Sequence, residues 1–186
     1  MSNGIPTVYA NIRFRSRLEA TWAAFFDLCS WDWKYEALDL DRYIPDFFLL
    51  TKTGPLLVEV KPAVRFEDFV PAHAEKILEA GWTGNAMMVG SGLILDKRDE
   101  WSFGLIRRPL ERDPGDWTFA WPTTCENCHI GMVDLWEKPD PFAGEYQPWP
   151  CLICGSDLGS HAGNASRRAI DLWHRAQNAT QWRPGR

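Results

Sequence analysis

The sequence contains no uninterrupted apolar run near the roughly 20 residues that a helix needs to cross a bilayer. It also shows no internal repeat and no low-complexity tract. Its first residues, Met1-Ser2-Asn3-Gly4-Ile5-Pro6, lack the basic start and apolar run of a secretion signal. We therefore expect that the chain is not an integral membrane protein and has no membrane partner, and that it resides in a reducing cytoplasm.

A large excess of either charge is also missing, since 20 Lys and Arg stand against 25 Asp and Glu, for a net charge of −5. With 45% hydrophobic and 24% charged residues among 186, the composition excludes disorder, collagen and coiled coil as the main content. Residues 160–186 carry five Arg and one Asp, which makes them +4 and leaves −9 for residues 1–159. An acidic body argues against a generic nucleic-acid coat, but it suits carboxylates that hold a cation.

The spacing of apolar residues predicts a helix over 14–29, because these side chains recur every three or four positions. A second helix is expected after Pro62, with Asp68 as its N-cap and Gly81 as its stop. A final helix is expected over 166–177. The segments that suit strands are 31–37, 44–50, 56–61 and 86–89.

The predicted order of helix, three strands, helix and strand indicates an α/β fold with a mixed sheet. From Gly90 to Pro150 the chain is rich in Trp, Pro and Gly and has weak periodicity. We expect an α/β core over residues 1–110 and a separate segment over 111–186 that ends in a basic helix.

Three charged side chains fall on the predicted strands 44–50 and 56–61. The period of two in a strand puts Glu59 and Lys61 on one face, and Asp46 starts the preceding strand. If these strands are neighbours, the two carboxylates and the lysine converge. Paired carboxylates repel unless a cation lies between them, and their hard oxygens suit Mg²⁺ or Mn²⁺. The implied chemistry is phosphodiester hydrolysis, with Lys61 orienting the attacking water.

Pro45-Asp46 followed by Glu59-Val60-Lys61 resembles the PD-(D/E)XK nuclease superfamily, which has the restriction-endonuclease-like fold. The predicted αβββαβ order over residues 12–95 agrees with this resemblance. It implies that Asp46 and Glu59 ligate the metal, that Lys61 positions water, and that Glu19 on the first helix is an accessory catalytic ligand. The resemblance is nearest to small nucleases of phages and mobile elements, including transposon-end endonucleases.

Each of these residues also has a structural interpretation. Glu59 and Lys61 suit the solvated face of a half-exposed strand, and Ser16 with Glu19 fits a helix capping box. Glu36 is expected at the surface, although its strand position also suits a metal-facing role. His73 is assigned no chemistry.

Cys125, Cys128, Cys151 and Cys154 form two C-x₂-C pairs separated by 22 residues, which is close to zinc-ribbon spacing. Gly155 supplies the permissive backbone that such turns favour. Four thiolates close a tetrahedral shell, so we expect a structural Zn²⁺. Redox chemistry is the rival, but neither pair opens a helix within a βαβ unit.

Other residues near the pairs have open roles. His129 and His161 are substitutes that four thiols make unnecessary, and Cys29 is expected in the core. The zinc segment either staples a region too small for its own core or contacts nucleic acid. Four tryptophans in this region suit stacking on unpaired bases as well as core packing, namely Trp117, Trp121, Trp136 and Trp149.

The sequence as a whole predicts a metal-dependent endonuclease that acts on nucleic acid, with DNA favoured over RNA. Its short core suits a homodimer or a larger nucleoprotein assembly. The alternative is a catalytically inactive nucleic-acid- or protein-binding module that keeps the nuclease-like core and the structural zinc.

Overall fold

A seven-stranded mixed sheet forms the centre of the protein in a computed structural model that describes residues 4–69, 71–95, 100–107, 117–134, 150–158 and 165–181. The strands of this sheet follow the order of the chain and are β3 (Trp33–Tyr35), β4 (Phe47–Thr51), β5 (Gly54–Val60), β6 (Asn85–Leu95), β7 (Trp101–Arg107), β8 (Thr118–Cys125) and β9 (His129–Asp134). A separate hairpin precedes them and consists of β1 (Thr7–Tyr9) and β2 (Ile12–Phe14). The helices are α1 (Arg17–Leu28), α2 (Pro71–Glu79) and α3 (Ser166–Ala179).

The β5–β6 pair is parallel, while the other neighbouring pairs of the sheet are antiparallel. A parallel pair needs a crossover, and α2 lies in the connection between its strands. The mixed α/β class and the predicted order from α1 through β3, β4, β5 and α2 to β6 are therefore confirmed.

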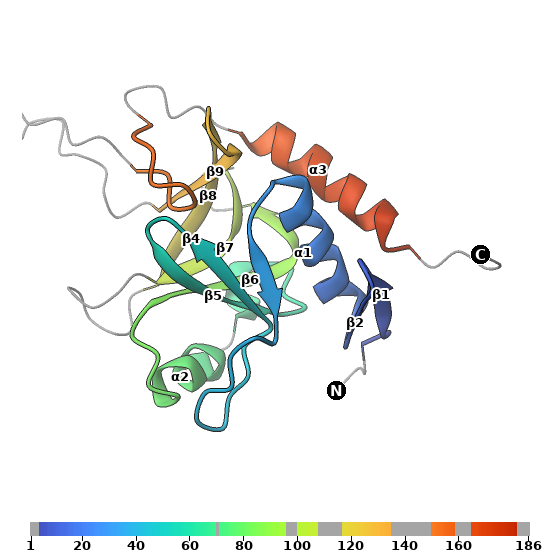
Figure 1. Cartoon of the computed structure of the whole chain (residues 1–186), viewed down its shortest axis with the longest axis vertical. Helices are drawn as coiled ribbons and strands as arrows, with labels where there is room; N and C mark the ends of the chain where they lie inside the picture. The colour runs from blue at the N-terminus through green and yellow to red at the C-terminus, as the bar shows by residue number, and fades with distance from the viewer. Residues whose placement is uncertain are drawn as a thin grey trace, which may run out of the picture.

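Helix α1 lies between the sheet and α3, as Figure 1 shows, while α2 lies apart from both helices. Trp22 of α1 is fully buried, and its ring centroid lies 4.6 Å from that of Trp173 of α3. Val58 belongs to the same core as Trp22, whereas its neighbour Leu57 packs in a separate cluster with Ile77 of α2. Because alternate residues of a strand face opposite sides, α1 and α2 cover opposite faces of the sheet.

The predicted start of the second helix is wrong. Asp68 closes a 3₁₀ turn (Phe66–Asp68), where its Oδ2 accepts the N–H groups of Val64 and Arg65 at 3.0 Å each. Its side chain is therefore used by residues that precede it, and α2 begins only at Pro71. The predicted strand 86–89 extends at both ends, as β6.

Strands β7, β8 and β9 lie in the region where the sequence shows weak periodicity. Two residues that ordinarily argue against a strand lie inside them, Gly104 in β7 and Pro122 in β8. A Cβ at Gly104 would lie 1.9 Å from the carbonyl oxygen of Met88, so the close approach of two backbones requires this glycine. These strands belong to the same sheet as β5, because β6 pairs with β7 and β7 with β8.

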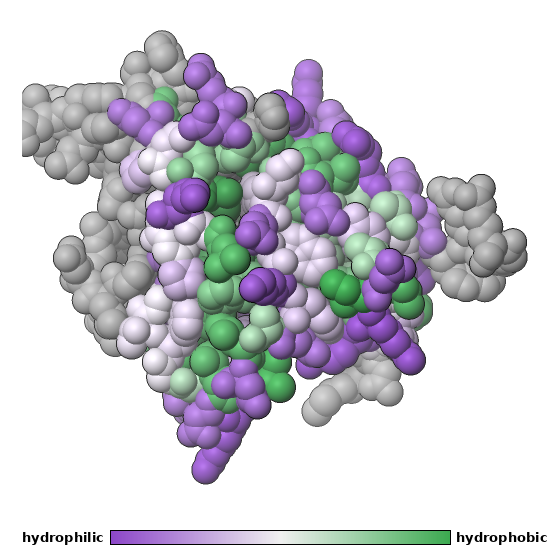
Figure 2. Space-filling view, in the orientation of Figure 1, coloured by the Kyte–Doolittle hydropathy of each residue, from purple (hydrophilic) through white to green (hydrophobic). Residues whose placement is uncertain are grey.

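The predicted division into 1–110 and 111–186 stays a prediction, and both residues at that boundary lie outside the described part of the chain. The final helix is confirmed as α3, which continues to Ala179. No helix among the described residues is both long enough and apolar enough to span a bilayer. On the face drawn in Figure 2, apolar atoms form a band over the region of β4, where Leu50 is 46% exposed.

Candidate metal centres

Asp46 and Glu59 are brought together by the pairing of β4 with β5. The register joins Phe47 to Val58, so Asp46 lies opposite Glu59 one position further along the antiparallel ladder. Asp46 is 4% exposed, and its Oδ2 accepts the N–H of Val60 at 2.7 Å. The convergence of these two acids, which the sequence predicted only if the strands were neighbours, is present in the fold.

Glu59 and Lys61 share one face of the chain and form an ion pair between Lys61 Nζ and Glu59 Oε1. The second oxygen of Glu59 accepts the hydroxyl of Tyr43 at 2.6 Å. Burial raises the pKa of Tyr43, and the charge of Glu59 raises it further, so the hydroxyl stays a neutral donor. Glu59 is only 8% exposed, which differs from the solvated face considered as the alternative.

Glu19 has the capping role considered from the sequence, and its role as an accessory ligand stays a prediction. Ser16 is the N-cap of α1, and its Oγ accepts the N–H of Glu19 at 3.1 Å while donating to Glu19 Oε1 at 2.7 Å. The other oxygen of Glu19 accepts the hydroxyl of Tyr35 at 2.5 Å. The charge of Glu19 also acts on Asp46 and raises its pKa, so the cap lies beside the acid pair.

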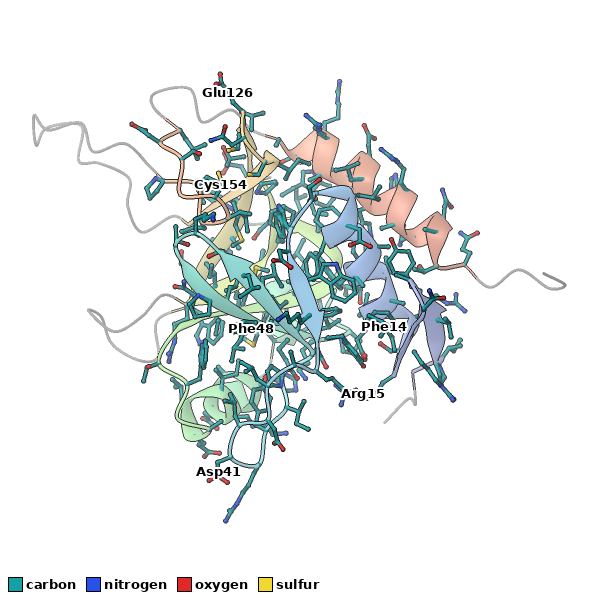
Figure 3. All side chains as sticks on the ribbon, viewed as in Figure 1. Phe14, Arg15, Asp41, Phe48, Glu126 and Cys154 are labelled. Carbon is teal, nitrogen blue, oxygen red and sulfur yellow. The ribbon has the colours of Figure 1, made fainter. Side chains whose placement is uncertain are left out.

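Arg15 is the residue of this centre that the sequence did not single out. Its guanidinium forms an ion pair with Asp46, lies 3.0 Å from Glu36 Oε1 and lies 3.8 Å from Glu19 Oε2. Figure 3 labels it at the lower end of the sheet, beside the end of β3. The one available signal was its position four residues before Glu19, and this spacing is common on helices. We name Glu19, Asp46, Glu59, Lys61 and Arg15 the carboxylate centre.

Burial is the largest cause that raises the pKa of Asp46 to about 7, followed by the nearby charge of Glu59. The N–H of Val60 and the guanidinium of Arg15 oppose this rise, because both favour the ionised form. The buried carboxyl group therefore gains a proton more easily here than in water.

The donor atoms of the carboxylate centre do not form a closed set of three. Among the residues that the structure describes, one group of three or more His, Cys, Asp or Glu side chains has all its ligand atoms within 4.8 Å of one another, and this group consists of cysteines. Carboxylate oxygens are the donors that Mg²⁺ and Mn²⁺ prefer. A catalytic Mg²⁺ or Mn²⁺ at Asp46 and Glu59 thus stays a prediction.

The four cysteines of the two C-x₂-C pairs converge, as their spacing predicted. Cys125 and Cys128 flank the tight turn between β8 and β9, and Cys151 and Cys154 lie in the loop that follows Pro150. The Sγ atoms of Cys125 and Cys154 are 3.4 Å apart, and those of Cys128 and Cys151 are 3.5 Å apart. These distances exceed a disulfide bond of about 2.05 Å and approach the separation of thiolates around one tetrahedral zinc. We name these residues the cysteine centre.

The chemistry of the cysteine centre fits a zinc ion. A hydrogen bond from the Cys128 thiol lowers the pKa of Cys151 to about 5, with help from N–H groups that include that of Ile153. The same hydrogen bond raises the pKa of Cys128, so the pair holds one thiolate readily. A Cβ at Gly131 would lie 2.5 Å from Cys151 Sγ, so the absence of a side chain there leaves room for the cluster.

The loop of the second cysteine pair is hydrogen-bonded to strand β9 and to the turn between β4 and β5. The N–H of Leu152 donates to Met132 of β9 at 2.8 Å, and the carbonyl of Ile153 accepts the N–H of Lys52 at 2.9 Å. Gly155 has a φ of 72°, the left-handed conformation that its position predicted. Lys52 lies in the β4–β5 turn, whereas Asp46 lies at the open end of the same hairpin. At roughly 3.3 Å per strand residue, the six positions from Asp46 to Lys52 correspond to about 20 Å along the hairpin.

The remaining candidates lie at the edge of these centres or outside them. Glu36 contacts Arg15 and has a side chain that is 35% exposed, and Cys29 lies in the core as predicted. Burial lowers the pKa of His73, and the charge of Lys61 lowers it further.

The tryptophans and histidines near the cysteine pairs are described only in part. Trp117 packs against the apolar clusters of Phe69 and Ile77, and Trp121 stacks on Phe119. Trp136, Trp149, His161 and the side chain of His129 lie outside the described part of the structure.

No protein-family model matches this chain, and neither the curated proteins nor the solved structures compared with it gave a match.

Proposed function

We propose that this protein is a metal-dependent endonuclease related to the PD-(D/E)XK superfamily. The observation that carries this proposal is the β4–β5 register, which sets Asp46 opposite Glu59 and leaves Lys61 paired with Glu59. The αβββαβ order of elements from α1 to β6 supports it as well.

The roles follow from the contacts of each side chain. Asp46 and Glu59 hold a divalent cation, which, when bound, acidifies a water molecule and polarises the phosphodiester. Lys61 orients that water and stabilises the negative charge that develops on the phosphate. Glu19 adds a carboxylate from the start of α1, where Ser16 and Tyr35 fix its orientation.

Two cationic side chains of the carboxylate centre compensate its acids when no metal is bound. Arg15 compensates Asp46, and Lys61 compensates Glu59. Arg15 has a side chain that is 58% exposed, so it is free to turn from Asp46 toward the phosphate of a substrate. The structural zinc acts at the other end of the hairpin, where it fixes the β4–β5 turn against β9.

A second candidate function is a catalytically inactive module that binds nucleic acid or protein. The contact between Arg15 and Asp46 favours it, because a guanidinium already compensates the carboxylate that the nuclease needs for its metal. In that case the acids and cations form a permanent structural network, and the zinc segment is the working part of the protein.

Cleavage assays separate the two functions. The pure, zinc-containing protein is incubated with labelled single-stranded DNA, duplex DNA and RNA in the presence of Mn²⁺. If the protein is a nuclease, the wild type cleaves at least one of these substrates. Lys61→Ala and Asp46→Ala should each lower the cleavage rate by about 10³-fold or more, while both variants keep the cooperative unfolding transition. Intact substrates with the wild-type protein favour the inactive module.

A further inference from the structure

A cleft of about 930 Å³ opens beside the carboxylate centre. Glu19 lines it, and so does Val60, whose N–H binds Asp46. A second cleft of about 250 Å³ shares Ser91, Trp173, His174 and Gln177 with the first. The two clefts therefore form one groove, which begins at the carboxylate centre and follows α3.

The side chains that α3 contributes to this groove are the apolar Ile170 and Trp173 and a stripe of polar residues beside them. The polar residues are His174, Gln177 and Asn178, whose spacing of i, i+3 and i+4 puts them on one face of the helix, and Gln181, which lines the groove just beyond the end of α3. The buried face of α3, which contains Ala169 and Ala176, is a different one. The polar stripe is therefore not needed to hold α3 against α1.

The charged residues of α3 are not among the residues that line the two clefts. At 100° per residue, Arg168 and Arg175 project on the solvent side, whereas Arg167 lies two turns before His174 on the same face; none of the three lines either cleft. Figure 2 shows polar atoms along the outer side of α3. Among the described residues, Glu19 is the one acid that lines the groove, at its end on the carboxylate centre.

We propose that this groove binds the nucleic-acid strand that passes the carboxylate centre, through the stripe formed by His174, Gln177, Asn178 and Gln181. The inference rests on the proposed nuclease function and identifies where its substrate lies. Amide side chains donate to phosphate oxygens and to base edges, and both kinds of contact serve nucleic-acid recognition. A groove that is continuous with the reacting centre keeps the strand aligned with it.

A matched pair of substitutions on α3 tests the proposal. Gln177→Glu and Arg175→Gln each lower the net charge by the same amount, on the same helix and two residues apart. Both side chains are exposed, so neither change should unfold the protein. Binding is measured by fluorescence anisotropy with labelled single-stranded DNA, duplex DNA and RNA, with Ca²⁺ replacing Mn²⁺.

We expect Gln177→Glu to raise the dissociation constant about tenfold and Arg175→Gln to raise it by less than about threefold. If Arg175→Gln weakens binding as much as Gln177→Glu, the solvent-side arginines bind the strand and the groove proposal is wrong, whether or not the enzyme cuts. If the wild-type protein binds these probes but does not cut them with Mn²⁺, the proposed nuclease function is wrong. The comparison of the two variants then still tests whether the groove binds the strand. If it neither binds nor cuts them, both proposals fall.

Discussion

The cysteine centre and the carboxylate centre lie at opposite ends of the β4–β5 hairpin and are built differently. Four thiol groups come within 4.8 Å of one another in the first, whereas the acids of the second are arranged around Arg15 and Lys61. A thiol of ordinary pKa is mostly neutral near pH 7, and hydrogen bonds stabilise the one thiolate at Cys151, so the thiols gather without a cationic side chain from the described residues. Carboxylates ionise at neutral pH, and the chain must supply cations to bring them together.

The same contrast predicts how each centre responds to its metal. Zinc should be bound tightly and contribute to the stability of the fold, because no cationic side chain in the described part of the chain competes with it for the four thiolates. A divalent cation at the carboxylate centre must compete with Arg15 and Lys61, so it should bind more weakly and exchange. The variants that follow are ordered from the largest expected effect to the smallest.

Cys151→Ser should have the largest effect, because the free energy of zinc binding is part of the free energy of folding at such sites. We expect a loss of roughly 4 kcal/mol in the free energy of unfolding and a zinc content well below one per chain. Elemental analysis and thermal unfolding measure these quantities. Cys29→Ala is the matched control, since it changes a buried cysteine outside the centre and should leave the zinc content intact.

Gly131→Ala tests the packing of the same centre without removing a ligand. The new Cβ would lie 2.5 Å from Cys151 Sγ, and relieving this overlap should cost about 3 kcal/mol. The zinc content should fall as well. Gly81→Ala is the control, because it strains a residue with a φ of 73° but meets no neighbouring atom. An equal loss of zinc in both variants would contradict the geometry of the cluster.

Asp46→Asn tests the carboxylate centre through its dependence on pH. The pKa of Asp46 rises from 3.8 to about 7 in the folded chain, so its protonated form stabilises the metal-free protein below about pH 4. This stabilisation is lost as the pH rises through 7. The free energy of unfolding should thus fall by on the order of 2 kcal/mol between about pH 5 and pH 8.

In Asp46→Asn this dependence should disappear, which chemical denaturation at several pH values measures in the presence of a chelator that spares the zinc. Asp41→Asn is the control, because the side chain of Asp41 is 84% exposed. A pH dependence that survives in Asp46→Asn would assign it to another group.

Arg15→Gln should have the smallest effect on the fold, because its side chain is 58% exposed and solvent weakens its ion pairs. Its main effect should be on the metal, since the cation that competes for Asp46 is removed. We expect Mn²⁺ to bind about fivefold more tightly in calorimetric titrations. Arg13→Gln, which makes the same charge change on β2, should leave the Mn²⁺ affinity as it is.

The sequence predicted most of what depends on local spacing. The cysteine centre followed from two short C-x₂-C turns, and α1 followed from its apolar period and its N-cap, Ser16. Asp46, Glu59 and Lys61 were found because strand geometry sets their faces. The pairing of their strands was assumed, and the register of β4 with β5 now supplies it.

Residues that depend on long-range pairing were beyond the sequence. Arg15 compensates Asp46 across 31 positions, and Tyr43 reaches Glu59 from a loop without a distinctive pattern. Strands β7 and β8 were missed because Gly104 and Pro122 interrupt the pattern that marks a strand. The groove along α3 was missed because it forms only when α3 lies beside α1.

Counting the metals in one preparation tests most directly whether the chain has two centres of different chemistry. The zinc-containing protein is titrated with Mn²⁺, and bound Mn²⁺ and zinc are counted in the wild type and in Asp46→Ala. We predict that the wild type binds Mn²⁺ beside about one zinc, and that Asp46→Ala loses the Mn²⁺ while its zinc stays. Mn²⁺ binding that Asp46→Ala leaves unchanged, or that displaces the zinc, would contradict the account.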